Sequence, residues 1–410
     1  MKLNNMNDFD VIIVGAGMVG LTVANLFKDT RLRVALIDKS ESSVNTSATG
    51  LDEPKFDSRV SALSSSSREI LTRLGAWTLI EQQRYCDLRE MYVWDADGTG
   101  SITFSADDLA APRLGTIIEN SLVIEALTQC LESTCDVQLL RPCSVDALEE
   151  IDDWVLLNTA DQGVLRARLV IAADGVNSKI RELKSFEVRE WEYNHNAIVS
   201  TVKTAKPHQK IALQRFMPTG PLALLPLSSS VNDNCQMYSS IVWSAEPAYA
   251  ESLMDMTDKD FCRQLSKCSE SRFGEVIDCG TRQIFPLKQR HSVNYSKDRI
   301  VLVGDAAHSI HPLAGQGANL GFLDAEALTN EIKKGLDVGR EVFDPVTMDR
   351  YQRARKGHNL GMMVLMEGFK RVFAEDILSV RWLRNFGMSR IDELKPIKNY
   401  LARRAMGLNT

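Results

Sequence analysis

Long apolar segments and paired cysteines are both missing from this chain of 410 residues. No apolar run approaches the roughly 18 residues that a helix needs to cross a bilayer. The opening stretch MKLNNMNDFD lacks the basic and apolar regions of a signal peptide. The eight cysteines form no C-x-x-C pair and have no nearby histidine at ligand spacing, which argues against a zinc site and favours reduced, buried thiols. We therefore expect a cytoplasmic protein.

A net positive charge is also missing, since 48 Lys and Arg stand against 54 Asp and Glu and the formal net charge is -6. Binding to a phosphate backbone requires clustered positive charge, so we exclude general nucleic-acid binding. Residues 377 to 410 depart from this balance, with seven Lys or Arg against two acids and three interleaved aromatic residues. Two interpretations stay open here: an ordinary solvated helical face, or a peripheral contact with anionic membrane lipid.

The composition that is present is globular, with 44% hydrophobic and 25% charged residues. A chain of this length has enough residues for two or more hydrophobic cores, and it contains no internal repeat. We expect a multidomain protein.

The first chemical signal lies between residues 11 and 38, where VIIV, a glycine-rich turn, an apolar helical segment and RVALID follow one another. This order is typical of a strand, turn, helix and second strand that bind a dinucleotide. Gly15 permits the tight turn, Gly17 admits the pyrophosphate, Gly20 allows close packing, and Asp38 is placed to bind the adenosine ribose. The expected cofactor contacts in this segment are Gly15, Gly17, Met18, Val19, Gly20, Asp38 and Lys39.

The second signal is DRIVLVGDAAHSIHPLAGQGANLG, residues 298 to 321. An apolar strand ends at an acid, and glycines then precede a helix expected over ANLGFLDAEALTNEIKK. The carboxylate of Asp305 is suited to bind the ribityl hydroxyls of a flavin, which nicotinamide lacks, so FAD is favoured over NAD. Glycines before the helix bring backbone N–H groups toward the flavin ring. The expected contacts are Gly304, Asp305, Pro312, Gly315, Gln316, Gly317, Ala318 and Asn319.

Several longer stretches carry a family resemblance. HPLAGQGANLGFLD, LVIAADGVNSKIR, FDSRVSALSSSSREILTRLGAW, IIEN, QRFMPTGPLALLPL and LARRAMGL span nearly the whole chain. Together they resemble the flavin hydroxylases of ubiquinone biosynthesis, a branch of the para-hydroxybenzoate hydroxylase-like monooxygenases. The resemblance implies that Arg59 and Asn120 contact FAD, and that the motif holding Asp174, Gly175, Ser178 and Arg181 serves both FAD and the transient NAD(P)H.

Each of these residues also has a simpler interpretation. The alternative for Arg59 is a residue that caps or pairs on a surface helix, and Asn120 is a favoured cap for the helix expected over SLVIEALTQCLE. His308 and His311 alone are too few ligands for a metal site, so none is predicted. We interpret His311 as a residue that shapes the turn before Pro312.

The motif order predicts an α/β fold, α+β overall, in which a Rossmann-like FAD domain carries an inserted, mostly antiparallel β-sheet domain and C-terminal helices. Strands are expected over AIVSTVKTA, IALQRFM, LALLPL, CQMYSSIVW and TRQIFPLKQ. The expected FAD-domain parts are 1–80, 105–185 and 283–355; the substrate-domain parts are 81–104 and 186–282; and the helical end is 356–410.

The resemblance also implies a function. NAD(P)H reduces FAD, O2 adds to the reduced ring, and the resulting flavin hydroperoxide hydroxylates a polyprenylated phenol or benzoquinol. The cofactor performs this chemistry, so no catalytic acid or base is assigned. An apolar pocket is expected, and plain core packing is the alternative for each of its candidates. These candidates are Phe216, Leu224, Leu225, Pro226, Trp243, Phe285 and Pro312.

Two rival functions stay open. One is a soluble hydroxylase of a small phenol, and the other is a non-catalytic FAD-binding subunit of a biosynthetic assembly. A flavin halogenase is disfavoured, because the six tryptophans cannot form that branch's W-x-W-x-I pattern.

Overall fold

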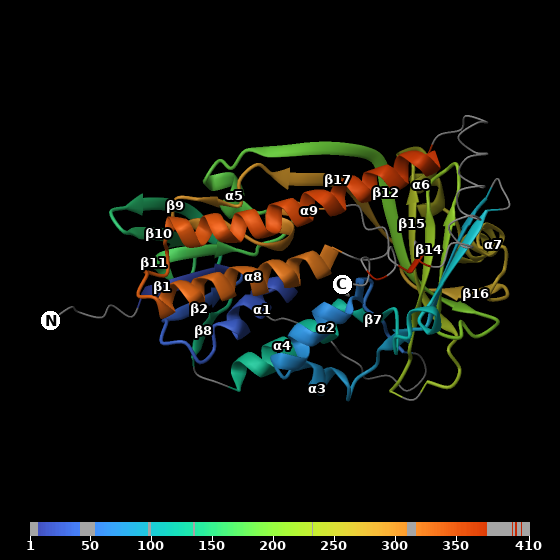
Figure 1. The fold of residues 1–410 in the computed structure, drawn as a ribbon. Helices are drawn as coiled ribbons and strands as arrows, with labels where there is room; N and C mark the ends of the chain where they lie inside the picture. Colours follow the sequence, from blue (N-terminus) through green and yellow to red (C-terminus); the bar gives the residue numbers. More distant parts are fainter. Residues whose placement is uncertain are drawn as a thin grey trace.

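The computed structural model describes residues 7–41, 54–96, 100–133, 136–231, 233–309 and 317–374, together with 396, 398, 399 and 403. Two large sheets dominate this part of the chain. Figure 1 shows them at opposite ends of an elongated molecule, joined along one side by the long strand β12 (Val188–Thr204) and its partner β17 (Gln283–Ser292).

The first sheet has a parallel centre. Its parallel strands are, in spatial order, β19 (Ile300–Leu302), β11 (Gly163–Ala172), β1 (Asp8–Val14), β2 (Val34–Ile37) and β8 (Val137–Leu140). Antiparallel strands extend it at β18 (Ser296–Lys297), β10 (Trp154–Thr159) and β9 (Val145–Ile151). Val11, Ile12 and Ile13 are fully buried, because a central parallel strand is covered on both faces. The strands predicted at VIIV and RVALID are therefore confirmed.

Helices cover the first sheet, and their apolar side chains pack against its strands to form a hydrophobic core. They are α1 (Met18–Leu26), α2 (Ser65–Arg73), α3 (Ala76–Ile80), α4 (Asn120–Glu132), α5 (Lys179–Leu183), α8 (Gly317–Asp337) and α9 (Pro345–Ala374). Helix α8 packs between α1 and α9, which brings the two glycine-rich motifs of the sequence together. None of the described helices has both the length and the hydropathy that a bilayer crossing requires.

The second sheet is almost entirely antiparallel. Its order is β20 (His308–Ser309), β17, β12, β15 (Tyr238–Ala245), β14 (Leu222–Leu227), β13 (Ile211–Phe216), β5 (Glu90–Asp95) and β6 (Ser101–Ser105), with β16 (Val276–Cys279) paired to β12. Only β13 and β5 run parallel among its described strands. The antiparallel sheet predicted from alternating apolar residues is confirmed.

Different elements cover the two faces of this sheet. Helices α6 (Pro247–Met254) and α7 (Asp258–Cys268) pack on one face around the buried Trp243. The other face meets a small sheet of β3 (Val60–Leu63), β7 (Gly115–Glu119) and β4 (Cys86–Leu88). The junction of the three sheets is where a pocket forms.

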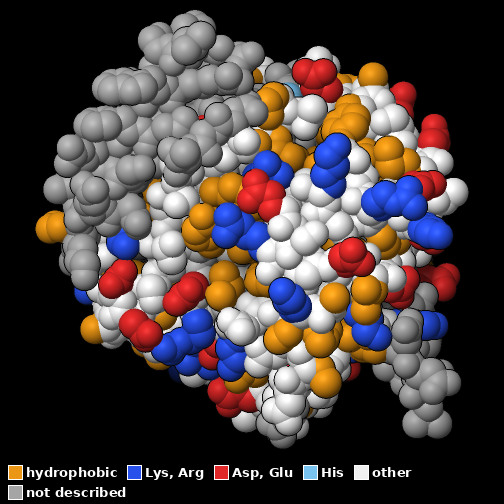
Figure 2. Space-filling view, turned by 90° about the vertical axis from the view of Figure 1, so that its right-hand side faces the viewer, with side chains coloured by type: hydrophobic (Ala, Val, Ile, Leu, Met, Phe, Trp, Pro, Cys, Tyr) orange, Lys and Arg blue, Asp and Glu red, His pale blue; other side chains and the backbone are white. Residues whose placement is uncertain are grey.

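Four residues of the basic C-terminal stretch are described. The two basic ones, Lys398 and Arg403, contact the segment 107–109. Lys398 is buried and donates to a carboxylate oxygen of Asp108 at 3.1 Å, beside the 3-10 turn η1 (Asp107–Leu109). Arg403 donates to the carbonyl of Leu109 at 3.4 Å. Neither a solvated face nor a lipid contact therefore describes Lys398. On the face shown in Figure 2, basic, acidic and apolar side chains are interspersed among the coloured residues.

Candidate active site

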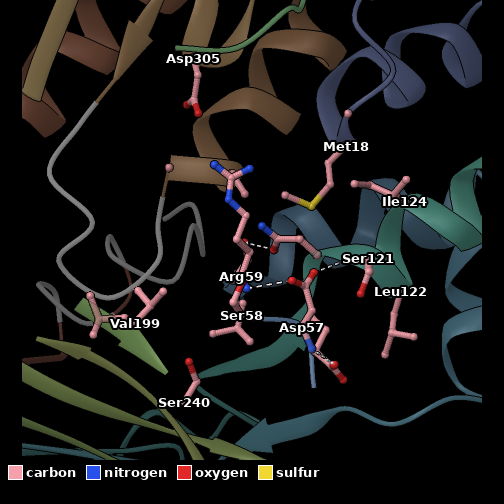
Figure 3. A pocket seen from close by; sticks show the side chains of 18 of the residues that line it. Met18, Asp57, Ser58, Arg59, Ser121, Leu122, Ile124, Val199, Ser240 and Asp305 are labelled. Atoms are coloured by element: carbon pink, nitrogen blue, oxygen red, sulfur yellow. Dashed lines mark hydrogen bonds between the residues drawn. The ribbon is translucent and has the colours of Figure 1, made fainter. Parts of the chain in front are cut away.

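A pocket of about 740 Å³ lies where the first sheet, the second sheet and the small sheet meet. Figure 3 shows its walls: the start of α1, the segment 55–61, the start of α4, the turn at Asp305 and the second sheet. Its lining includes Gly17, Met18, Val19, Arg59, Asn120, Gly175, Leu225, Phe285, Asp305, Gly317 and Ala318, all of which the sequence singled out.

The three glycines at the turn into α1 have two different tasks. A Cβ on Gly15, where φ is +102°, would lie 2.5 Å from the carbonyl oxygen of Ala173, and one on Gly20 would lie 1.8 Å from that of Gly15. Both positions therefore require glycine for close backbone packing. A Cβ on Gly17 would meet nothing within 4 Å. The open space at Gly17 and the backbone N–H groups at the start of α1 fit a pyrophosphate.

Asp38 follows β2 and fastens the glycine turn. Its Oδ2 accepts the N–H of Ala16 at 2.6 Å and its Oδ1 accepts the N–H of Ser40 at 2.8 Å. Burial opposes its ionisation, but the hydrogen bonds from Ser40 and Ala16 and the charge of Arg141 outweigh it, so the pKa of Asp38 is lowered. Its neighbour Lys39 is exposed and lies outside the pocket lining.

Arg141 is a residue that the sequence analysis missed. It follows β8, and its Nη2 lies 3.5 Å from the carbonyl oxygen of Ala16. Its Nε is buried without a hydrogen-bond partner among the described residues. A guanidinium with a spare donor beside the start of α1 fits the charge of a cofactor phosphate. No local sequence motif indicates a role for Arg141, because only the order of the parallel strands brings β8 close to this turn.

Asp305 sits on the 3-10 turn η2 (Gly304–Ala306), directly after β19. Figure 3 shows its carboxylate at one end of the pocket, with the guanidinium of Arg59 directed toward it. Asp305 is exposed to the cavity, and desolvation by the surrounding walls raises the pKa of its carboxylate, although the charges of His308 and Arg59 act in the opposite direction. An acid presented at the carboxyl end of a parallel strand fits the ribityl hydroxyls of a flavin.

The structure argues against the simpler interpretations of Arg59 and Asn120. Arg59 precedes β3 rather than lying on a helix, and its guanidinium carbon is 5.8 Å from the ring centre of Phe285. Glu119 is the N-cap of α4, so Asn120 is not its cap. The Oδ1 of Asn120 instead accepts the hydroxyl of Ser61 at 2.7 Å at the pocket wall. The capping alternative is therefore wrong for Asn120.

The second sheet contributes an apolar wall, and strand alternation decides which residues form it. Leu225 and Phe285 line the pocket as expected. Leu224 and Trp243 do not, because they lie on the opposite face, in the core under α6 and α7. Phe216 and Pro226 are also absent from the lining. Neighbouring residues of a strand point to opposite faces of the sheet, and composition alone does not show which of the two faces the pocket.

The motif around Asp174 connects the loop before α5 to the turn η2 through hydrogen bonds. Asp174 accepts the N–H groups of Lys179 at 2.8 Å and Ile180 at 3.2 Å, and burial raises its pKa despite these bonds. Ser178 caps α5. Arg181 donates to the carbonyl of Ala306 at 2.9 Å, which ties this motif to η2.

The remaining predicted residues fall into two groups. Pro312, Gly315, Gln316 and His311 lie outside the described residues. Asn319 is buried and does not line the pocket: its Oδ1 accepts the N–H of Ser64 at 2.9 Å and the hydroxyl of Ser67 at 2.7 Å. It therefore fastens α8 to α2 rather than reaching toward the cofactor.

A second set of lining residues was not singled out as site residues, although Asp57 and Glu119 lie within the stretches FDSRV and IIEN. Asp57 accepts the N–H of Ser121 at 3.1 Å, and Glu119 accepts the Nε of Arg84 at 2.7 Å. The first bond holds the segment before β3 against the start of α4, and the second holds the segment before β4 there. Each joins residues far apart in the chain, so no local spacing predicts them.

Comparisons with known proteins agree with this site. The family described as FAD binding domain matches residues 8–362. The 3-demethoxyubiquinol 3-hydroxylase of Escherichia coli is 33% identical over 399 residues, covering 97% of this chain and 98% of that protein. The mitochondrial ubiquinone biosynthesis monooxygenase COQ6 of Xenopus tropicalis is 32% identical over 96% of this chain and 92% of its own length.

A solved structure shows the same fold. The p-nitrophenol 4-monooxygenase PnpA of Pseudomonas putida superimposes with a TM-score of 0.77 at 18% identity, covering 98% of this chain and 99% of that one. With the pocket, the glycine turns and these relatives in agreement, the chain belongs to the FAD-dependent hydroxylase family of ubiquinone biosynthesis, within the para-hydroxybenzoate hydroxylase-like monooxygenases.

Proposed function

We propose that this protein hydroxylates the aromatic ring of a polyprenylated phenol or benzoquinol in ubiquinone biosynthesis, using FAD, NAD(P)H and O2. The names of its relatives support this reaction class. The observation that carries the proposal is a single pocket whose one side offers cofactor loops and whose other side is an apolar sheet.

The cofactor end of the pocket is built from backbone and from few charged groups. The start of α1 at Gly17 would hold the pyrophosphate, with Arg141 beside it, and Asp305 would hold the ribityl chain. When bound, FAD accepts a hydride from NAD(P)H and activates O2. Arg59, whose guanidinium points toward Asp305, would place positive charge beside the cofactor, to which reduction adds negative charge.

The substrate end of the pocket is apolar. Ala197, Val199, Leu225, Val242 and Leu287 come from neighbouring strands and present aliphatic surface. Such a wall excludes water from the reacting ring and fits an aromatic substrate with an alkyl tail. We further propose that the parts 81–104 and 186–282, together with Leu287 on the adjoining strand β17, serve the substrate, while the parts 1–80 and 105–185 and the rest of 283–355 serve the cofactor.

We also propose a cytoplasmic protein with a peripheral membrane contact through the basic stretch 377–410, near a biosynthetic assembly. The support is its charge and the water-insoluble tail of the proposed substrate. Charge reversal at Arg381 and Arg384 should reduce flotation with vesicles containing anionic lipid. Lys398→Gln is a control, because Lys398 already pairs with Asp108. Wild-type protein that stays with the soluble fraction would contradict the membrane contact.

The decisive experiment is quinone profiling in cells that lack the protein. A prenylated intermediate one oxygen short of the next compound should accumulate, and it should disappear when purified holoenzyme, NAD(P)H and O2 are supplied. Protein that retains FAD yet oxidises no NAD(P)H and forms no product would favour the non-catalytic subunit. Turnover of small phenols alone would favour the soluble hydroxylase.

A further inference from the structure

Ser240 stands out on the sheet wall of the pocket. The lining residues from the second sheet are Ala197, Val199, Leu225, Ser240, Val242, Phe285 and Leu287. Among these, Ser240 is the one polar side chain. The strand neighbours that face it in register are Leu225 on β14 and Thr201 on β12, and Thr201 is not part of the lining.

The orientation of Ser240 is fixed by its strand. Residues of β15 alternate between the two faces of the sheet, so Ser240 and Val242 face the pocket while Ile241 and Trp243 enter the core under α6 and α7. Figure 3 shows the hydroxyl of Ser240 directed into the pocket. The residue is only 1% exposed, so a small part of its surface reaches the pocket.

We infer that Ser240 binds the ring oxygen of the phenol or quinol substrate and thereby sets which ring carbon faces the flavin. A pocket that is otherwise apolar orients its ligand through the few polar groups it contains. A serine hydroxyl both donates and accepts, so it pairs with either a phenolic O–H or a methoxy oxygen. This inference rests on the proposed function and adds to it a residue that selects an oxygenated ring.

The chain offers a matched control one residue away. Ser239 is also buried, but it lies on the other face of β15, and its hydroxyl has no hydrogen-bond partner among the described residues. Ser239→Ala removes the same atom from the same strand without touching the pocket. A general effect of losing a hydroxyl from β15 would therefore show in both variants.

The test measures binding of a short-chain 2-prenylphenol to purified holoenzyme through the change in the flavin absorption spectrum. Ser240→Ala should weaken binding about 3- to 10-fold, the loss expected for one net hydrogen bond. The FAD dissociation constant should be unchanged. During turnover, a larger share of NAD(P)H oxidation should end as hydrogen peroxide, because a loosely held ring is hydroxylated less efficiently. Ser240→Thr should restore part of the binding, and Ser239→Ala should match wild type.

A deoxy analogue sharpens the result. For the same prenylated ring without its hydroxyl, wild type and Ser240→Ala should bind equally, since the interaction is absent in both cases. Equal loss for both ligands, or equal binding of the phenol by wild type and Ser240→Ala, would overturn the inference and leave the proposed function standing. A wild-type holoenzyme that neither binds nor hydroxylates any prenylated phenol would instead reject the proposed function.

Discussion

Asp324 and His308 are joined by a hydrogen bond at a position that water does not reach, and this contact fixes the turn that presents Asp305. The same carboxylate oxygen of Asp324 accepts Nε2 of His308 and the backbone N–H of Gly304. Gly304 and His308 flank Asp305 on either side in the chain. Asp324 therefore holds both ends of the short segment that carries the proposed ribityl ligand.

The other oxygen of Asp324 is bound to α9. It accepts Nε of Arg355 at 2.7 Å and Nδ2 of Asn359 at 3.1 Å, and Asn359 also donates to the hydroxyl of Tyr295 at 3.3 Å. Asp324 is 0% and Arg355 9% exposed by side chain. One carboxylate thus joins α8, α9 and η2, so the long helix and the cofactor turn share a common anchor.

Replacing Asp324 by Asn should destabilise the protein strongly. The substitution keeps the shape but leaves Arg355 buried without its counter-charge, which costs about 3 to 5 kcal/mol. Urea unfolding followed by tryptophan fluorescence measures this difference. Glu331→Gln is the control: it removes an ion pair with the exposed Lys334 and should change the free energy of unfolding by no more than about 1 kcal/mol. Similar values for both variants would contradict the role of the buried pair.

His291 should make stability depend on pH. Burial, together with the positive charges of His308, Lys356 and Arg189, lowers its pKa to about 4. In the unfolded chain its pKa is about 6.5, so between these values the unfolded state binds more protons than the folded state. The contribution of neutral His291 to the free energy of unfolding is fully present above pH 6.5 and is lost as the pH falls toward 4.

The measurement is the free energy of unfolding at intervals from pH 7.5 to 4.5, in wild type and in His291→Gln. The variant should show a shallower loss in this window. Some loss should persist in both proteins, because burial also lowers the pKa of His208. Parallel curves for the two proteins would show that His291 does not contribute.

The sequence predicted those parts of the fold that short-range spacing encodes. The strand, turn and helix from Asp8 to Leu26 follow from β-branched residues and glycine spacing, because each requirement is met within a few residues. The prediction that Leu224 and Trp243 line the pocket was wrong, because the face to which a strand residue points depends on the register with neighbouring strands. Arg141 was missed for a related reason: only the order of parallel strands brings it to the start of α1.

Gly17 and Gly20 should respond differently to the same change. In Gly20→Ala the new methyl group would meet the carbonyl oxygen of Gly15 at 1.8 Å, so the backbone must shift and folding should suffer. In Gly17→Ala it meets open space, so the apoprotein should keep its melting temperature while FAD affinity falls, because the methyl group enters the pyrophosphate position. Gly17→Val should bind FAD still more weakly. Calorimetry of the apoproteins and FAD titration separate these effects; equal loss of folding in both alanine variants would contradict the assignment.

Asp305 should contribute mainly to cofactor retention. Removing its carboxylate in Asp305→Ala takes away a charge-assisted bond to the ribityl chain, so FAD binding should weaken by about 1.5 to 3 kcal/mol. Folding should be little affected, because the side chain projects into the pocket and Asp324 still holds the turn. Asp107→Ala is a suitable control, since that carboxylate is exposed and pairs only with Arg89 among the described residues. Flavin fluorescence on titration of the apoprotein gives the dissociation constant for each variant. Unchanged flavin affinity in Asp305→Ala would remove this residue from the cofactor site.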